Sequence, residues 1–235
     1  MTPPVMNDRR PLHHPDAEVL LDFASGAAHE AGAVIIATHL ALCPQCRDTV
    51  KKFESLGGAL IEDLAPSALA PGSRDAVMAR LDELPPNRGS SRRDALIASG
   101  THTDLRIPPP LRDYIGADLN ALTWRRIGPT VEQIEIPLGG ANAAIKERIR
   151  LLRAKAGSAI QRHTHRGTEM TLVLSGGFRD RSQQYLRGDF ALVDQQIDHS
   201  PRVDTDGPCI CLSVTDAPIR FTGPFGRILN LFVRF

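Results

Sequence analysis

Three side chains that bind soft metals well lie within eight positions near the start of the chain: His39, Cys43 and Cys46. Residues four apart on a helix share a face, so His39 and Cys43 point the same way if this stretch is helical. The Cys-x-x-Cys spacing brings two thiolates to one point, and sets of Cys and His commonly hold tetrahedral zinc. The spacing predicts a metal site, and the alternative is a buried helix whose Cys behave as small hydrophobes.

A structural zinc site usually has four protein ligands, so this set lacks one. The candidates for the fourth ligand are His13, His14 and His29. His14 lies just before the first predicted helix, whose start could approach the Cys pair if the first and third helices pack together. The spacing alone leaves the choice among the three open.

A second group of metal-binding side chains lies in the C-terminal half, in the pattern Gly157-x5-His163-x-His165-x3-Glu169-x6-Gly176. Side chains two apart on a strand point to the same face, so His163, His165 and Glu169 can all point into a barrel if the chain bends between them. The alternative without a metal is a strand with two exposed His and a surface Glu. The pattern favours a second metal site.

A further ligand for this second group has to come from a different hairpin. His199 fits, because it follows the Gly188-Asp189 turn that would open the neighbouring strand. Three His and one Glu suit several divalent metals, including Zn, Mn, Fe and Ni. We therefore predict zinc or another divalent metal at this group, and we predict no catalytic residue.

The elements that must position these groups differ between the two halves of the chain. Residues 16–28, 43–60 and 73–84 repeat apolar side chains close to a 3.6-residue period, and residues 33–42 are apolar almost throughout, so the first 84 residues predict helices. We expect Gly57-Gly58 to interrupt or end the helix that begins at the Cys pair.

From residue 111 onwards, short apolar segments alternate with turn residues. Strands at this spacing predict a sandwich or small barrel. Residues 85–110 are rich in Pro, Gly and Ser and are expected to form a linker between domains at 1–84 and 111–235. The strands are expected at 123–127, 131–137, 146–154, 171–175, 178–185, 190–193, 209–215 and 229–235.

Composition and charge exclude several classes of protein. Hydrophobic residues make up 42% and charged residues 23% of the 235 residues, which is ordinary for a globular protein. No apolar run reaches the length of a membrane-spanning helix, and the polar start does not resemble a secretory signal. Residues 1–84 carry 7 Lys and Arg against 12 Asp and Glu, which disfavours nucleic acid and favours a basic partner. Four Cys without an export signal predict reduced thiols and a cytoplasmic location.

The first 80 residues resemble the zinc-binding anti-sigma factors. In that family a helical domain wraps a sigma factor and blocks its contacts with core polymerase. The resemblance implies zinc held by His14, His39, Cys43 and Cys46, and many members carry a membrane span after this domain, which this chain lacks. The matching residues are His14, Leu20-Leu21, Ala24 and Gly26, followed by His39-x-x-x-Cys43-x-x-Cys46.

The spacing of the second group matches the first cupin motif in full. The second cupin motif matches in part, because Asp194-Gln195-Gln196 replaces the Pro-x-Gly that usually precedes its His. A helical zinc domain followed by a cupin barrel resembles the ChrR family of cytoplasmic anti-sigma factors over nearly the whole chain. The resemblance implies zinc in both domains, a cupin needed for the response to singlet oxygen or organic peroxides, and the cupin ligands His163, His165, Glu169 and His199.

The resulting hypothesis is a regulator that is not an enzyme. It would bind and inhibit an extracytoplasmic-function sigma factor, contact no nucleic acid or membrane directly, and release sigma when the cupin senses oxidative stress. The alternative is a metal-dependent cupin enzyme, such as a dioxygenase or an isomerase. Cys209 and Cys211 share one strand face with α-carbons about 7 Å apart, so they are expected as buried core residues, or as a redox pair if they line the pocket.

Overall fold

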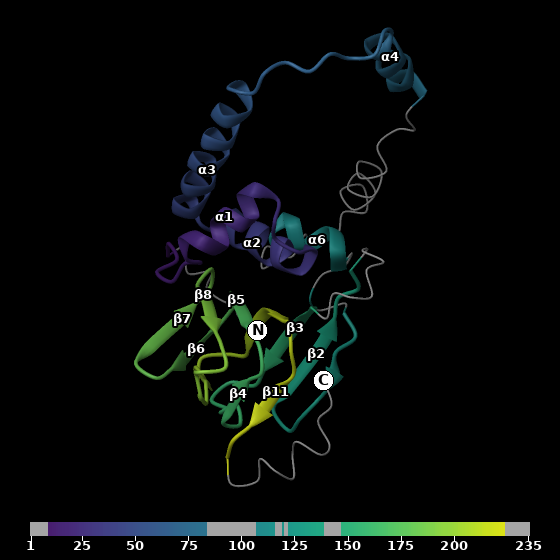
Figure 1. The fold of residues 1–235 in the computed structure, drawn as a ribbon. Coiled ribbons are helices and arrows are strands. Elements are labelled where there is room, and N and C mark those ends of the chain that lie inside the picture. The colour runs from purple at the N-terminus through teal and green to yellow at the C-terminus, as the bar shows by residue number, and fades with distance from the viewer. Residues whose placement is uncertain (1–8, 84–106, 116–118, 120–121, 139–146, 224–235) are drawn as a thin grey trace. The chain divides into compact units, whose positions relative to one another are not determined.

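The computed structural model describes residues 9–83, 107–115, 119, 122–138 and 147–223. Helices come first along the chain and strands follow, as Figure 1 shows. This order confirms the predicted fold class, in which an all-helical N-terminal part precedes an all-β C-terminal part.

The chain divides into two compact units. Residues 1–57 and 105–235 form one unit, and residues 58–104 form the other. The helices up to residue 57 therefore share a unit with the strands. The predicted linker lies mostly outside the described residues, so the predicted domain boundaries at residues 84 and 110 stay predictions.

The first helix, α1 (Ala17–Ser25), is capped at both ends. The carboxylate of Asp16 accepts a hydrogen bond from the amide of Val19 at 3.1 Å, which satisfies one of the free N–H groups at the helix start. At the other end, Gly26 adopts a φ of 76°, the left-handed conformation that lacks a steric penalty only in glycine. These caps fix the length of the helix that follows His14.

The second helix, α2 (Glu30–Leu42), is the central helix of its unit. It contacts α1 and the short α6 (Pro109–Ile115), and it also contacts two strands, β5 (Glu169–Ser175) and β10 (Cys209–Thr215). A helix that is apolar all round needs packing partners on more than one side. Its buried residues are Ala31, Gly32, Val34, Ile35, Ile36, Thr38, His39 and Leu40.

The third helix, α3 (Pro44–Glu62), buries only Cys46 and Val50. It runs through Gly57 and Gly58, so the expectation that these glycines interrupt or end it is wrong. Each glycine costs a helix only about 1 kcal/mol relative to alanine, which the rest of a 19-residue helix outweighs. A fourth helix, α4 (Ser73–Glu83), belongs to the other unit and confirms the helix predicted there.

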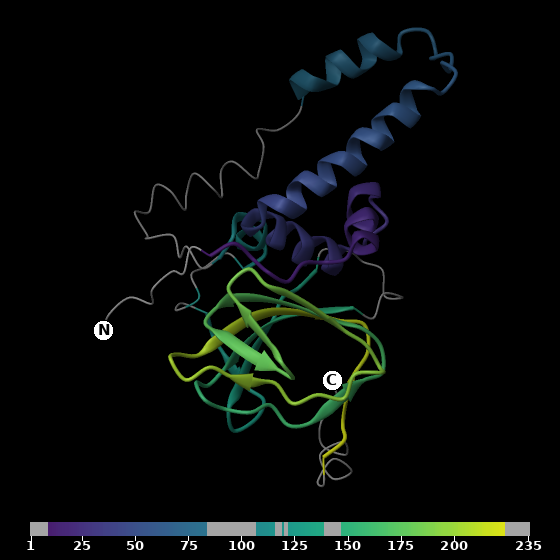
Figure 2. The same ribbon diagram turned by 90° about the vertical axis from the view of Figure 1, so that its left-hand side faces the viewer.

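The strands form three sheets that close into a barrel, which Figure 2 shows nearly end on. The largest sheet has six strands in the order β1-β2-β3-β10-β5-β8, and the smaller ones have the orders β7-β6-β9 and β11-β4. All pairs are antiparallel. Besides β5 and β10, the strands are β1 (Arg125–Arg126), β2 (Val131–Glu135), β3 (Arg148–Ala154), β4 (His163–His165), β6 (Gly177–Asp180), β7 (Gln183–Leu186), β8 (Phe190–Val193), β9 (Arg202–Val203) and β11 (Ile219–Phe221).

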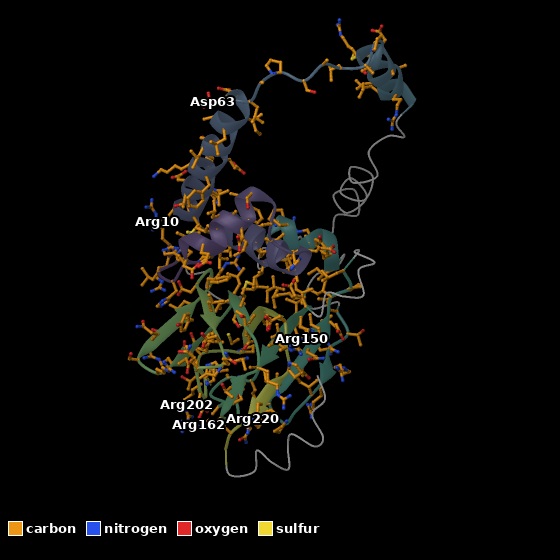
Figure 3. The ribbon with its side chains drawn as sticks, viewed as in Figure 1. Arg10, Asp63, Arg150, Arg162, Arg202 and Arg220 are labelled. Carbon is orange, nitrogen blue, oxygen red and sulfur yellow. The ribbon has the colours of Figure 1, made fainter. Side chains whose placement is uncertain are left out.

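The central strand β10 is buried on both faces. Side chains alternate along a strand, so Ile210, Leu212 and Val214 share one face and join the core that includes the buried residues of α2. Cys209 and Cys211 point to the opposite face and join a second core inside the barrel. Figure 3 draws the described side chains as sticks, and many of them lie between the helices and the strands of this unit.

One expectation for the strands needs correction, and another cannot be compared with the described residues. Residues 178–185 form two strands, β6 and β7, because the chain turns at Arg181, which has a φ of 54°. The predicted strand at 229–235 lies outside the described residues. The strands β9 and β11 escaped prediction because segments of two or three residues are too short to show a repeating pattern.

Among the described residues, no single helix is both long and apolar enough to cross a membrane. The pair α1 and α2 meets that criterion only when the two are joined across their 111° bend.

Candidate metal centres

Four side chains meet where the N-terminal segment, α2 and α3 come together: His14, His39, Cys43 and Cys46. We call this set the front cluster. One ligand atom from each residue lies within 4.8 Å of those of the other three. The structure therefore brings together the four residues that the family resemblance implied.

The break between two helices positions three of these ligands. His39 lies in the last turn of α2, and Cys46 lies in the first turn of α3. Between them Cys43 has an extended backbone, with φ −118° and ψ 101°, so the chain changes direction there. Pro44 can begin α3 because the first helical position needs no backbone N–H donor. The bend turns both thiols and the imidazole toward one point.

The distances within the front cluster fit a tetrahedral zinc ion. Zinc bonds of about 2.0–2.3 Å to nitrogen and sulfur place neighbouring ligand atoms roughly 3.3–3.8 Å apart. The Nδ1 atom of His14 lies 3.4 Å from both Cys sulfurs, and the Nε2 atom of His39 lies 3.3 Å from the sulfur of Cys46. Two thiols and two imidazoles are also the donor set of many structural zinc sites.

The surroundings of the front cluster favour the neutral form of the His39 imidazole and disfavour the thiolate form of Cys46 unless a cation is bound. Nδ1 of His39 donates a hydrogen bond to the carbonyl of Gly188 at 2.9 Å, so Nε2 is free to face the cluster. Burial lowers the pKa of His39 to about 4. Burial, reinforced by a hydrogen bond with Cys43, raises the pKa of the Cys46 thiol to about 12. A bound metal would stabilise the thiolate form that this environment otherwise disfavours.

The two other candidates for the fourth ligand lie elsewhere. The ring of His13 stacks near Tyr185, with centroids 4.4 Å apart, and its Nε2 atom contacts the carbonyl of Gln184 at 3.0 Å. His29 is the residue before α2 and is not part of the cluster. Of the three candidates, only His14 reaches the thiols.

The second group meets inside the barrel. We call His163, His165, Glu169 and His199 the barrel cluster, and their ligand atoms also lie within 4.8 Å of one another. The three imidazoles are between 3% and 8% exposed. His163 and His165 lie on β4, and Glu169 begins β5 after the predicted bend. The structure thus brings together all four predicted residues.

An antiparallel bridge joins His199 to this cluster. The amide of His163 donates to the carbonyl of His199, and the reverse bond forms as well, both at 3.0 Å. The Nε2 atom of His199 lies 3.1 Å from the Nε2 atoms of both His163 and His165, and Nε2 of His165 lies 3.4 Å from Glu169. Metal–nitrogen bonds of about 2.1 Å give neighbouring spacings of roughly 3.0–3.4 Å, so the residues fit a divalent ion.

Hydrogen bonds outside the barrel cluster orient its ligands. Nδ1 of His163 donates to the carbonyl of Gln161 at 2.7 Å, and Nδ1 of His199 contacts the carboxylate of Asp180 at 2.7 Å. The hydroxyl of Ser213 donates to Glu169 at 2.7 Å. Burial lowers the pKa of His163 and of His165, which favours the neutral form that binds metals.

Sequence reasoning missed these supporting residues. Asp180 lies in a stretch that was predicted as part of one continuous strand, and the hairpin there is what carries its carboxylate to His199. The contact of Gly188 with His39 is made by a backbone carbonyl, which every residue has, so the residue type could not indicate it. A carboxylate commonly orients a His that binds metal. The acidic residue type of Asp180 was therefore the one feature of the sequence that could have indicated this supporting role.

Replacing Asp180 with Ala is expected to weaken metal binding at the barrel cluster by about 10–100-fold, because the imidazole of His199 loses the carboxylate that orients it. Competition with a chelator measures the change. Asp204→Asn is the matched control, since this carboxylate contacts Arg179 and Gln184 but no residue of the barrel cluster. Unchanged affinity in the Asp180 variant would show that the contact is incidental.

The two barrel cysteines are core residues of the barrel. Cys209 and Cys211 are buried with their sulfurs 3.5 Å apart, and they pack against Val173 and Phe178. Burial and the hydrogen bond from Cys209 both hold the pKa of Cys211 above its usual range, with the hydrogen bond the larger cause. This confirms the prediction of buried core cysteines.

Comparisons with known proteins agree with this architecture. The family described as the ChrR cupin-like domain matches residues 113–217. The anti-sigma-E factor ChrR of Cereibacter sphaeroides is 39% identical over 94% of this chain and 98% of its own length. The structure of the anti-sigma ChrR of Rhodobacter sphaeroides, solved in complex with SigE, is 37% identical, covers 88% of this chain and 100% of that one, and superimposes with a TM-score of 0.74.

The fold and the two clusters define a protein with a helical metal-ligand motif and a cupin-like barrel. Identity at this level over nearly the full length of both chains reaches beyond the barrel to the helices that carry the front cluster. The chain belongs to the ChrR family of anti-sigma factors.

Proposed function

We propose that this protein binds an extracytoplasmic-function sigma factor and inhibits it. The observation that carries the proposal is the 39% identity to an anti-sigma-E factor across 94% of the chain. A relative of similar identity is known in complex with SigE. Both the helical part and the barrel match, so the proposal concerns the whole chain rather than one domain.

The end of α3 and the helix α4 expose apolar side chains that such a partner could contact. Leu60, Ile61 and Leu64 lie at or just after the end of α3 and are 62–69% exposed. On α4, Val77, Met78 and Leu81 are more than half exposed. Exposed apolar side chains on these two segments are candidates for contact with a partner. The acidic front half of the chain complements the basic surfaces of sigma domains.

We propose a structural role for the front cluster and a sensing role for the barrel cluster. The front cluster would hold zinc with four protein ligands, which leaves no open position for chemistry and suits a structural role. The barrel cluster would hold zinc or another divalent metal and receive the signal. A metal bound there would supply a Lewis-acidic centre, while the surrounding hydrogen bonds orient the ligands and the barrel limits the access of water.

The proposed signal is oxidative stress, in the form of singlet oxygen or an organic peroxide, acting in the cytoplasm. Chemistry at the barrel would shift the protein between a state that holds sigma and one that releases it. No direct contact with nucleic acid or membrane is part of this proposal. The rival is a metal-dependent cupin enzyme, such as a dioxygenase or isomerase, since three His and one Glu on a larger ion can leave positions open.

Co-purification of the full chain with an extracytoplasmic-function sigma factor from the same organism tests the proposal. Replacing Leu60 and Leu64 with Asp is expected to weaken sigma binding at least about 10-fold, since a charge in an apolar contact leaves it desolvated and unpaired. Leu192→Asp is the control, because Leu192 is also exposed but lies on β8 of the barrel. Turnover of a small substrate by a chain that captures no sigma would support the enzyme instead.

A further inference from the structure

The N-terminal segment that carries His14 lies against a turn of the barrel. This turn, Leu186–Phe190, joins β7 to β8. The amide of Phe190 donates to the carbonyl of His13 at 3.0 Å, and the ring of His13 packs on the neighbouring hairpin. Gly188 allows this close approach, since a Cβ atom built there would lie 2.8 Å from a ring carbon of Pro11.

One carboxylate binds the segment to the turn. Asp189 is 0% exposed, and each of its oxygens accepts two hydrogen bonds. One oxygen accepts from the amides of Leu12 and His13, at 2.6 and 3.1 Å. The other accepts from the guanidinium of Arg9 and the amide of Leu186, both at 2.8 Å. A buried carboxylate is costly unless its oxygens are satisfied, and here four donors do so.

The same turn also contacts a second ligand of the front cluster. The carbonyl of Gly188 accepts the hydrogen bond from Nδ1 of His39 at 2.9 Å. The carboxylate of the next residue fixes the backbone immediately before His14. Two of the four front ligands, one from the N-terminal segment and one from α2, are therefore held by adjacent residues of the barrel.

The turn leads directly to the barrel cluster. The strand β8 begins at Phe190 and ends at Val193, which pairs with Glu169 of β5. A single strand of four residues thus separates the contacts to the front ligands from a ligand of the barrel cluster. Figure 1 shows β8 reaching from the barrel toward the helices.

We propose that Asp189 is a positioning residue of the front cluster, which acts by fixing the backbone of the N-terminal segment immediately before His14. Residues that orient metal ligands commonly change metal affinity when they are replaced. This role of Asp189 rests on the proposed binding of metal at the front cluster and requires no sigma factor.

Titration of the full chain with Co²⁺ tests the proposal, because thiolate ligands give the front cluster an absorption band that imidazole and carboxylate ligands do not give the barrel. Asp189→Asn replaces one carboxylate oxygen with an NH₂ group, which cannot accept the hydrogen bonds that the surrounding N–H groups donate. We expect this variant to bind Co²⁺ about 10–100-fold more weakly in front, with barrel affinity unchanged. Arg9→Gln, which removes only the ion pair, is expected to give a smaller loss at the same cluster.

The control is Asp204→Asn, a carboxylate of the barrel that contacts Arg179 and Gln184 but not the N-terminal segment. It should leave the front affinity unchanged. Wild-type front affinity in the Asp189 variant overturns the proposal. Equal losses at both clusters also overturn it, because they indicate general destabilisation. A sigma-binding assay on the same samples is independent of these titrations, so failure of the proposed function is recognised separately.

Discussion

Replacing Cys43 and Cys46 together with Ser is expected to empty the front cluster and abolish sigma binding. Both thiols are almost fully buried, and a serine hydroxyl does not replace a thiolate as a zinc ligand. Zinc contributes about 10–16 kcal/mol to the folding of small zinc domains, which equals or exceeds the whole stability of a typical protein. When the metal is lost, the helices α1 to α3 should lose their fixed arrangement relative to one another.

Elemental analysis of the purified chain and a pull-down with sigma measure the two effects. The matched control replaces Cys209 and Cys211 with Ser, which removes the same number of buried thiols from the core of the barrel, where no ligand of the front cluster lies. That control should keep both the front metal and sigma binding. A Cys43 and Cys46 double variant that binds sigma without metal would show that the front cluster is not structural.

Replacing His163 and His165 together with Ala is expected to remove the metal from the barrel cluster, with a loss of affinity above about 100-fold. This exceeds the loss for an orienting residue because two of the four ligands themselves are gone. Sigma binding should persist, since the helical surface proposed to contact sigma carries neither residue. Release of sigma by singlet oxygen or an organic peroxide should be lost.

Sigma release from a purified complex, followed before and after exposure to oxidant, distinguishes these outcomes. His29→Ala provides the control, because it removes an imidazole that belongs to neither cluster. Release should proceed in the control as in the wild-type protein. If the His163 and His165 double variant fails to bind sigma at all, the division of tasks between the clusters is wrong.

Much of the site could be predicted because metal ligands leave a strong pattern in the sequence. The spacing of His39, Cys43 and Cys46 marked them as one ligand set, although the bend at Cys43 rather than one helix face brings them together. The parity of His163 and His165 needed only a strand. The choice of His14 over its neighbour His13 needed information about the three-dimensional structure. The two adjacent side chains reach different neighbours, and which one faces the thiols depends on how the N-terminal segment lies against the barrel.

The supporting residues could not be predicted for the same reason. Asp189 occupies a Gly-Asp turn, a position where Asp is common whatever its contacts. Its role arises from residues about 180 positions earlier in the chain, and composition carries no information about such a pairing. Gly57 and Gly58 gave the opposite kind of error. They predicted a helix end from local sequence, but the helix around them is long enough to continue through both.

The burial of α2 has a consequence for how the protein folds. Its apolar residues belong to the same core as Leu172 and Leu212 of the barrel, so neither part can complete that core alone. The helical segment up to residue 57 and the barrel look like two domains by composition, yet they share one set of buried contacts. They are therefore expected to form and melt in a single cooperative transition, in which residues 58–104 are not included.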